Sequence, residues 1–167
     1  MNRLFALLLT ALVMTGLQAQ TKSDLPNVKL KNLDGKEVNV AKLSNNGNPF
    51  ILTFWDMHCR SCLVEHKTLN ELYSDWQDET GVKIYSINTD DSRETPNIKP
   101  FVEGKNWEFE FLLDVNKELD RAMNVNNMHP YTFLFDGKGK LVYSHNGFNP
   151  GDEDGLYEEI LKVVKKK

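Results

Sequence analysis

The chain has 167 residues, of which 40% are hydrophobic and 26% are charged, as is ordinary for a globular domain with a full core. Its formal net charge is −4, and its one basic cluster is a run of three lysines at the C-terminus. Because no basic stripe is present to neutralise phosphates, these values argue against nucleic acid as the main partner.

Residues 1–20 have the pattern of a signal peptide. Arg3 supplies a positive charge, Leu4 to Val13 form an apolar core, and Ala19 ends the segment before Gln20. This core is shorter than the stretch of about 20 residues that spans a bilayer, so we expect cleavage after Ala19 rather than a retained membrane anchor. Residues 21–167 would then form one exported domain, with the periplasm as the expected compartment.

From Asn27 onward, the sequence predicts alternating strands and helices. Two short strands, 28–30 and 38–40, flank Asp34-Gly35, a dipeptide typical of hairpin turns. The apolar run Phe50–Trp55 predicts a buried strand. The next predicted elements, in chain order, are a helix from about residue 59 to 77, a strand at 82–87, a helix at 96–104, a strand at 109–113 and a short helix near 119–123.

The C-terminal third predicts a second hairpin and a last helix. Tyr131–Phe135 and Leu141–Tyr143 flank a glycine-rich turn, and Leu156 and Ile160 begin an apolar helix face. A β-α-β half is thus followed by a β-β-α half. We therefore expect an α/β protein with helices on both faces of a mixed sheet.

The two cysteines of the chain, Cys59 and Cys62, are spaced C-x-x-C. They follow the buried strand and stand where a helix begins, so the unpaired N–H groups of the first helical turn favour a thiolate at Cys59. The second thiol is near enough to close a disulfide. Such a small loop constrains the unfolded chain very little, which favours a redox switch over a structural bridge.

The segment Phe54–Glu65, which reads F-W-D-M-H-C-R-S-C-L-V-E, resembles the active-site segment of thioredoxin-fold proteins, and in particular of the exported TlpA/ResA-type thiol–disulfide oxidoreductases. An earlier hairpin with a D-G turn and the later segment Pro130–Leu134 also match that family, so the resemblance covers about residues 25–167. It implies a thioredoxin-like fold with an N-terminal β-hairpin extension, and a protein-disulfide reductase.

The resemblance also implies disulfide exchange without a cofactor or metal. Cys59 would be the nucleophile that attacks a substrate disulfide, and Cys62 would resolve the mixed disulfide. Glu65 lies on the same helix face as Cys62 and is a candidate proton shuttle, with a solvated surface carboxylate as the alternative. His58 would modulate the Cys59 thiolate, as a cation or as a proton acceptor.

Substrate contact is expected around Pro130, which in this family is a cis-proline that lies against the cysteines. His129 precedes it, and Trp55 and Arg60 flank the cysteine motif, so these residues complete the candidate substrate-binding set. A bound segment would dock there in extended form.

Several positions depart from the family pattern. His58, His66 and His129 replace an aromatic residue, a proline and a small or β-branched residue, and we expect His66 to be a surface or hydrogen-bonded histidine. Thr53 stands where thioredoxins proper carry a buried aspartate. These differences concern the redox potential and the proton path rather than the class of chemistry.

Two other functions compete with disulfide exchange. Cys59 and Cys62 with His58 and His129 could bind Cu(I) or Zn(II) in a metal chaperone, although the known chaperones of this fold use a C-x-x-x-C spacing. A peroxidase of the peroxiredoxin type needs threonine or serine three residues before the reactive cysteine, and Asp56 occupies that position.

The sequence leaves the physiological substrate, the redox direction and the oligomeric state open. Candidate partners are exported protein disulfides, with apocytochrome c among them. A reductase in that compartment would also need a thiol-electron donor in the membrane.

Overall fold

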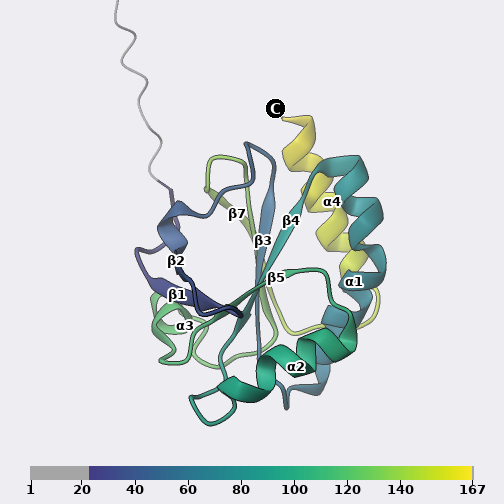
Figure 1. Cartoon of the computed structure of the whole chain (residues 1–167). Coiled ribbons are helices and arrows are strands. Elements are labelled where there is room, and N and C mark those ends of the chain that lie inside the picture. The colour runs from purple at the N-terminus through teal and green to yellow at the C-terminus, as the bar shows by residue number, and fades with distance from the viewer. Residues whose placement is uncertain (1–22, 167) are drawn as a thin grey trace, which may run out of the picture.

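The computed structural model describes residues 23–166, so the predicted signal peptide lies outside the described residues. Its strands are β1 (Lys29–Asn32), β2 (Glu37–Asn39), β3 (Phe50–Trp55), β4 (Lys83–Asn88), β5 (Glu110–Leu113), β6 (Tyr131–Phe135) and β7 (Leu141–Asn146). They form one seven-stranded sheet in the order β2-β1-β5-β4-β3-β6-β7. Figure 1 shows β3, β4 and β5 in the middle of the molecule. The pairs β3–β4 and β4–β5 are parallel, and the other pairs are antiparallel. The expected mixed sheet is confirmed.

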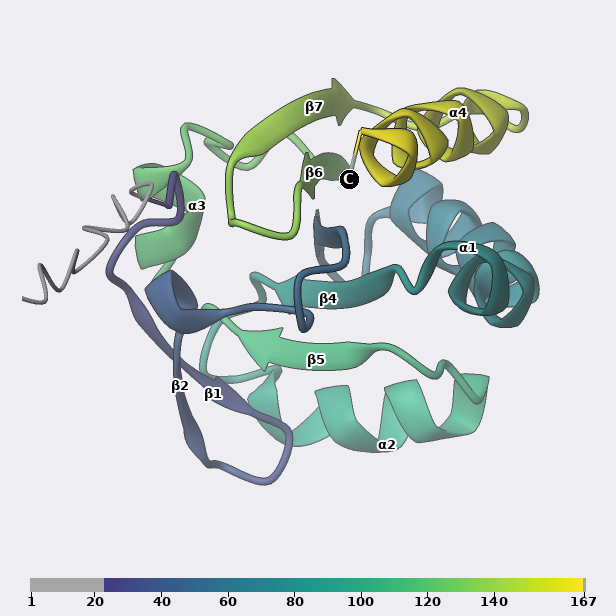
Figure 2. The same cartoon turned by 90° about the horizontal axis from the view of Figure 1, so that it is seen from above.

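The helices are α1 (Arg60–Thr80), α2 (Thr95–Lys105), α3 (Glu118–Ala122) and α4 (Asp152–Lys165), with a 3₁₀ turn, η1 (Val40–Lys42). Residues of α1, α2 and α4 pack on one face of the sheet, and residues of α3 and η1 pack on the other. Figure 2 shows α1 and α4 on the side of the sheet away from α3. The thioredoxin-like arrangement expected from the resemblance is therefore confirmed.

Strand β3 lies between the two layers and is buried along its whole length. Successive side chains of a strand point to opposite faces, so β3 supplies both layers. Ile51 and Trp55 belong to the core under α1, α2 and α4, whereas Phe50, Leu52 and Phe54 belong to the core under α3. A fully buried central strand fixes the position of whatever follows it, and the cysteine motif follows it directly.

Helix α1 begins and ends with residues whose backbone suits those positions. Cys59 is extended at the N-cap, with φ −77° and ψ 102°, and its sulfur accepts the N–H of Cys62. Gly81 ends the helix in the left-handed conformation at φ 68°, which glycine adopts at little cost. Between these ends, the buried positions recur at helical spacing from Cys62 to Thr80.

The predicted elements are all present, and the differences lie at their ends. Strand β7 extends three residues beyond the predicted end at Tyr143. Helix α1 extends three residues beyond the predicted end at residue 77. Helix α2 continues through Gly104, which was expected to end it, and ends at Asn106 in the left-handed conformation at φ 53°. Asparagine tolerates that conformation better than most residues, so it can replace glycine at a helix end.

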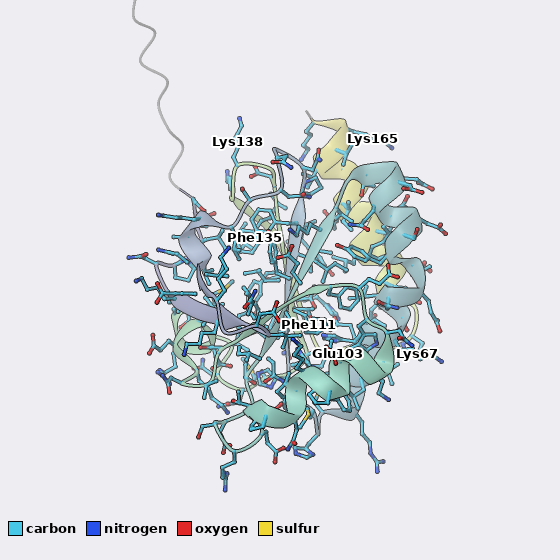
Figure 3. The ribbon with its side chains drawn as sticks, in the orientation of Figure 1. Lys67, Glu103, Phe111, Phe135, Lys138 and Lys165 are labelled. Atoms are coloured by element: carbon cyan, nitrogen blue, oxygen red, sulfur yellow. A yellow bond between two sulfur atoms is a disulfide. The ribbon has the colours of Figure 1, made fainter. Side chains whose placement is uncertain are left out.

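The first described residues are tied to the turn between β6 and β7. The Ser23 hydroxyl and the Asp24 N–H both donate to the carbonyl of Gly139, at 3.1 and 2.9 Å. The Asp24 carboxylate accepts the N–H of Leu141 at 2.9 Å. Lys138 in this turn lies at the upper end of the molecule in Figure 3. Over residues 23–166, no helix has the length and apolar character needed to cross a membrane.

Candidate active site

Cys59 and Cys62 are joined in a disulfide, with an S–S distance of 2.06 Å and Cα atoms 5.2 Å apart. The N–H of Cys62 donates to the Cys59 sulfur at 3.2 Å, and the N–H of Cys59 donates to the Asp56 carbonyl at 3.3 Å. Cys59 is partly exposed, whereas Cys62 is fully buried. Of the two cysteines, only Cys59 therefore has surface that is open to solvent.

Glu65 lies one helical turn beyond Cys62 and is only 2% exposed. Its two carboxylate oxygens accept hydrogen bonds from the hydroxyls of Thr53 on β3, at 2.8 Å, and Thr132 on β6, at 2.7 Å. Burial raises the pKa of Glu65 to about 7, and the two hydroxyls counteract only part of that shift. Glu65 is therefore not a solvated surface carboxylate, and it can take up or release a proton near neutral pH.

His66 is also fully buried, and both ring nitrogens have partners. Nδ1 lies 2.9 Å from the Cys62 carbonyl and Nε2 lies 2.8 Å from the Ser86 hydroxyl. A carbonyl can only accept, so Nδ1 carries the proton and Nε2 accepts from Ser86. Burial lowers the pKa of His66 to about 3, and the ring is neutral. Of the two expected roles, the hydrogen-bonded one is correct.

The His129–Pro130 peptide bond is cis, as the resemblance implied. The His129 ring is held between two carboxylates, with Nδ1 3.2 Å from Asp56 and Nε2 3.3 Å from Asp120. The hydrogen bond from His129 is the main reason why the pKa of Asp56 is lowered. The side chain of His129 is only 5% exposed, but the residue lines a pocket of this site, so its contact with substrate stays a prediction. The His129 ring also ties the segment before Pro130 to the loop before Cys59.

Trp55 differs from its expected role. It is fully buried and packs against His66, Phe101, Trp107 and Phe111, because it is the last residue of β3 and points to the face covered by α1, α2 and α4. A side chain in that position cannot contact a substrate.

His58 and Arg60 are exposed on either side of Cys59. They therefore remain candidates for contact with a partner. A pocket of about 320 Å³ adjoins His58, and His129, Asp56 and residues of the loop after β4 also line it.

The sequence singled out Thr53 but did not show which groups it meets, and Asp90 carried no signal in the sequence. Thr53 and Thr132 are separated by 79 positions, and they face each other only because β3 and β6 pair in antiparallel register at these two residues. Asp90 accepts the N–H of Met57 at 2.9 Å and so fixes the loop before Cys59. Helical spacing from Cys62 could have shown that Glu65 and His66 face the sheet, but not which groups they meet there.

Neither competing function gains support from this geometry. The two sulfurs are bonded to each other and both nitrogens of His129 meet carboxylates, so they are not arranged as metal ligands. Over residues 23–166, no group of three or more His, Cys, Asp or Glu side chains is placed to hold a metal ion. Asp56, where a peroxidase needs a hydroxyl, is bonded to His129 and to the N–H of His58.

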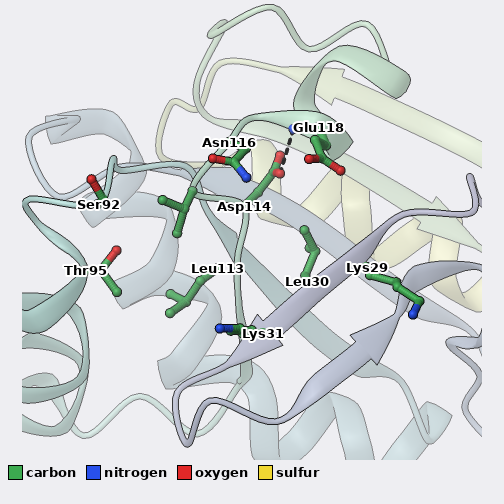
Figure 4. Close-up of a pocket in the computed structure, with 10 residues that line it drawn as sticks. Lys29, Leu30, Lys31, Ser92, Thr95, Leu113, Asp114, Asn116 and Glu118 are labelled. Carbon is green, nitrogen blue, oxygen red and sulfur yellow. Dashed lines mark hydrogen bonds between the residues drawn. The ribbon is translucent and has the colours of Figure 1, made fainter.

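The pocket in Figure 4 is separate from the disulfide. It has a volume of about 390 Å³ and lies between β1, the end of β5 and the starts of α2 and α3. Asp114 on its wall accepts the N–H groups of Glu118, Leu119 and Asp120 at 2.8, 3.2 and 2.8 Å. Its carboxylate therefore caps α3, which is a structural role.

Comparison with known proteins gives a consistent result. The sequence profile of the AhpC/TSA family matches residues 21–144. The chain is similar to the thiol:disulfide interchange protein DsbE of Yersinia pestis, with 31% identity over 85% of this chain and 71% of that protein. It is also similar to the thiol-disulfide oxidoreductase ResA of Bacillus subtilis, with 28% identity over 72% of this chain and 64% of ResA, just under two thirds of its length.

Solved structures agree with these relatives. A thioredoxin-like protein of Porphyromonas gingivalis superposes with a TM-score of 0.77 and 43% identity, covering 87% of this chain and 95% of its own. A putative DsbE of Chlorobium tepidum gives a TM-score of 0.73 and 25% identity, covering 87% of this chain and 99% of its own.

Proposed function

The chain belongs to the AhpC/TSA family and is a thioredoxin-like thiol–disulfide oxidoreductase, and from that premise we propose that it reduces disulfides of exported proteins through Cys59 and Cys62. The observation that carries the proposal is the unequal exposure of the two cysteines. Cys59 is open to a partner at the start of α1, and Cys62 is enclosed behind it.

In the first step, the Cys59 thiolate attacks one sulfur of the substrate disulfide. A mixed disulfide forms, and the other substrate sulfur leaves as a thiolate with the electron pair of the broken bond. Cys62 then attacks Cys59, which forms the Cys59–Cys62 disulfide and releases the second substrate sulfur as a thiolate. The two substrate thiolates take protons from solvent.

Glu65 is the proposed proton acceptor for Cys62. A thiol that is fully buried holds its proton more tightly than an exposed one, so Cys62 needs a base before it can attack. A carboxyl group whose pKa is about 7 can serve as that base and later return the proton. His58 and Arg60 are proposed to favour the Cys59 thiolate, and the pocket beside His58 to receive the substrate segment.

Export and the partners belong to the same proposal. The pattern of residues 1–20 supports transport of the domain to the periplasm, where a thiol-electron donor in the membrane would reduce the Cys59–Cys62 disulfide again. Relatives named DsbE and ResA support protein disulfides as substrates, and apocytochrome c is one candidate. Fractionation of cells that express the full chain should find a shortened protein in the periplasm.

Reduction of insulin in the presence of dithiothreitol tests the activity. We expect the protein with residues 21–167 to accelerate insulin precipitation and Cys59→Ser to abolish the acceleration. Cys62→Ser should accumulate mixed disulfides, because the resolving thiol is absent. Ser74→Ala, an exposed position of the same helix, is the control and should match the unmodified protein. Full activity in Cys59→Ser would refute the assignment of the nucleophile.

A further inference from the structure

Glu65 must exchange its proton with solvent although its side chain is enclosed. A small cavity borders it on the side away from β3, where Thr132, His145 and Asp152 also line the wall. The cavity leaves about 10 Å³ for the centre of a water-sized sphere, which is roughly the space that one water molecule needs. The wall carries enough polar groups to hold such a molecule.

The pairing of β6 with β7 brings His145 next to the Glu65 site. Thr132 and His145 are direct partners in the antiparallel register, so their side chains lie on the same face of the sheet. The Thr132 hydroxyl donates to Glu65 at 2.7 Å. His145 is thus one strand away from the hydroxyl that contacts the buried carboxyl group.

The series of side chains that runs from Glu65 through Thr132 to His145 ends at solvent. His145 Nε2 lies 3.3 Å from the Asp152 carboxylate, and the side chains of His145 and Asp152 are 37% and 33% exposed. The N–H of Asn149 donates to the same carboxylate at 2.7 Å and fixes it at the start of α4. A proton on this pair can therefore exchange directly with water.

The other groups that face Glu65 are less suited to this exchange. Thr53, from β3, is fully buried, and His66 on α1 lies 4.0 Å away with both nitrogens engaged inside the core. Tyr143 from β7 and Glu153 from α4 also line the cavity. Burial raises the pKa of Tyr143, so it holds its proton near neutral pH, and Glu153 already accepts the N–H of Gly151.

We propose that His145 and Asp152 form the solvent end of a proton path that serves Glu65, through the cavity between β6, β7 and α4. This proposal rests on the proposed function. When Cys62 attacks Cys59, the Cys62 proton passes to the Glu65 carboxylate. It then moves through the Thr132 hydroxyl, or through a water molecule that enters the cavity, to the His145 ring and from there to solvent. His145 touches neither substrate nor sulfur, so it acts only through Glu65.

The test is single-turnover reduction of a disulfide peptide by the reduced protein, followed over a range of pH in H₂O and D₂O. His145→Ala should be slower by about tenfold near neutral pH, as for loss of a proton-transfer group, with a larger solvent isotope effect. Added imidazole should restore the rate. Ser144→Ala is the matched control, because it alters the same strand at an exposed position on the other face. It should change neither rate nor isotope effect.

A second measurement does not depend on activity. In the oxidised protein, NMR titration of the Glu65 carboxyl group measures its pKa directly. Burial is the main cause of the raised pKa of Glu65, and the charge of Asp152 adds to it, so Asp152→Asn should lower that pKa.

The outcomes separate the two proposals. If His145→Ala reacts at the unmodified rate, or reacts slowly without rescue by imidazole, the path is refuted while disulfide reduction by the unmodified protein still stands. If the unmodified protein reduces no disulfide, the proposed function fails, and the NMR titration decides about the path. A Glu65 pKa that Asp152→Asn leaves unchanged would refute the path in either case.

Discussion

At the scale of single residues, Glu65 and His66 are neighbours on α1 whose pKa values move in opposite directions. Both are buried, and burial favours the neutral form of each, a protonated acid and a deprotonated base. The sequence could predict the cysteine motif and the place of Pro130, because those depend on local spacing. It could not predict the burial of Glu65, which depends on Thr53 and Thr132 from distant strands.

The two shifts predict how stability depends on pH. Glu65 binds its proton more tightly in the folded than in the unfolded chain, so its contribution to the unfolding free energy falls as pH rises from 4.5 to about 7. His66 binds its proton less tightly when folded, so its contribution rises from about pH 3 to 6.5. The two effects oppose each other in the window that they share.

Glu65→Gln removes the contribution of Glu65 and should therefore change how the unfolding free energy depends on pH. Relative to this variant, the unmodified protein should lose about 3 kcal/mol between about pH 4.5 and 8, taking roughly 1.4 kcal/mol for each pKa unit. Urea unfolding at several pH values measures the difference. Parallel profiles for the two proteins would show that Glu65 has an ordinary pKa.

His58 predicts a change in redox potential. A protonated imidazole beside Cys59 stabilises the thiolate and so the reduced protein, which raises the potential. His58→Trp should make the protein more reducing by roughly 10 to 30 mV, measured by equilibration with glutathione buffers. His58→Lys retains a positive charge and should keep the potential high. If all three proteins share one potential, the side chain at this exposed position has no electrostatic effect on Cys59.

At the scale of elements, the periodicity of the sequence was sufficient to predict the strands and helices but not where they end. The end of α1 depends on the backbone of Gly81 and on a close neighbour from the loop before β3. A Cβ atom at Gly81 would lie 2.8 Å from the Asn48 amide nitrogen. Such contacts join segments that are far apart in the sequence, so local patterns do not contain them.

Gly81→Ala should destabilise the protein through both the backbone and this contact. A non-glycine residue in the left-handed conformation costs about 1 to 2 kcal/mol, and displacement of Asn48 adds to that. Gly35→Ala is the control, because Gly35 has φ +79° but no atom within 4 Å of the new Cβ. Thermal unfolding measures the loss of stability in each variant. Gly35→Ala reports the backbone cost alone, and Gly81→Ala reports the backbone cost together with the contact to Asn48. A smaller loss for Gly81→Ala than for Gly35→Ala would contradict the structural account.

At the scale of the whole molecule, two cores lie on opposite faces of one sheet, and β3 belongs to both. The cysteine motif follows β3 directly, so the redox state of the motif and the stability of the fold are linked. Folding and reduction form a thermodynamic cycle. The difference in reduction potential between the folded and the unfolded chain therefore corresponds to the difference in unfolding free energy between the oxidised and the reduced protein.

The proposed role as a reductase therefore predicts that the oxidised form is the more stable one. A protein that gives up electrons readily is one whose disulfide form is favoured by folding, and about 30 mV corresponds to 1.4 kcal/mol. Urea unfolding with and without dithiothreitol measures the difference. The Cys59→Ser/Cys62→Ser double variant, which cannot form the bond, is the control for direct effects of dithiothreitol. Greater stability of the reduced form would indicate an oxidant instead.

The attachment of Ser23 and Asp24 to the β6–β7 turn places the first described residues at the end of the molecule opposite the disulfide. In the antiparallel β3–β6 pair, Phe50 lies opposite Phe135, so this turn adjoins the start of β3, whereas the disulfide follows its end. A strand of six residues separates the two ends by about 20 Å. A tether, tag or support joined ahead of Ser23 would attach to the end of the molecule opposite the disulfide. The disulfide would then stay accessible to a partner protein.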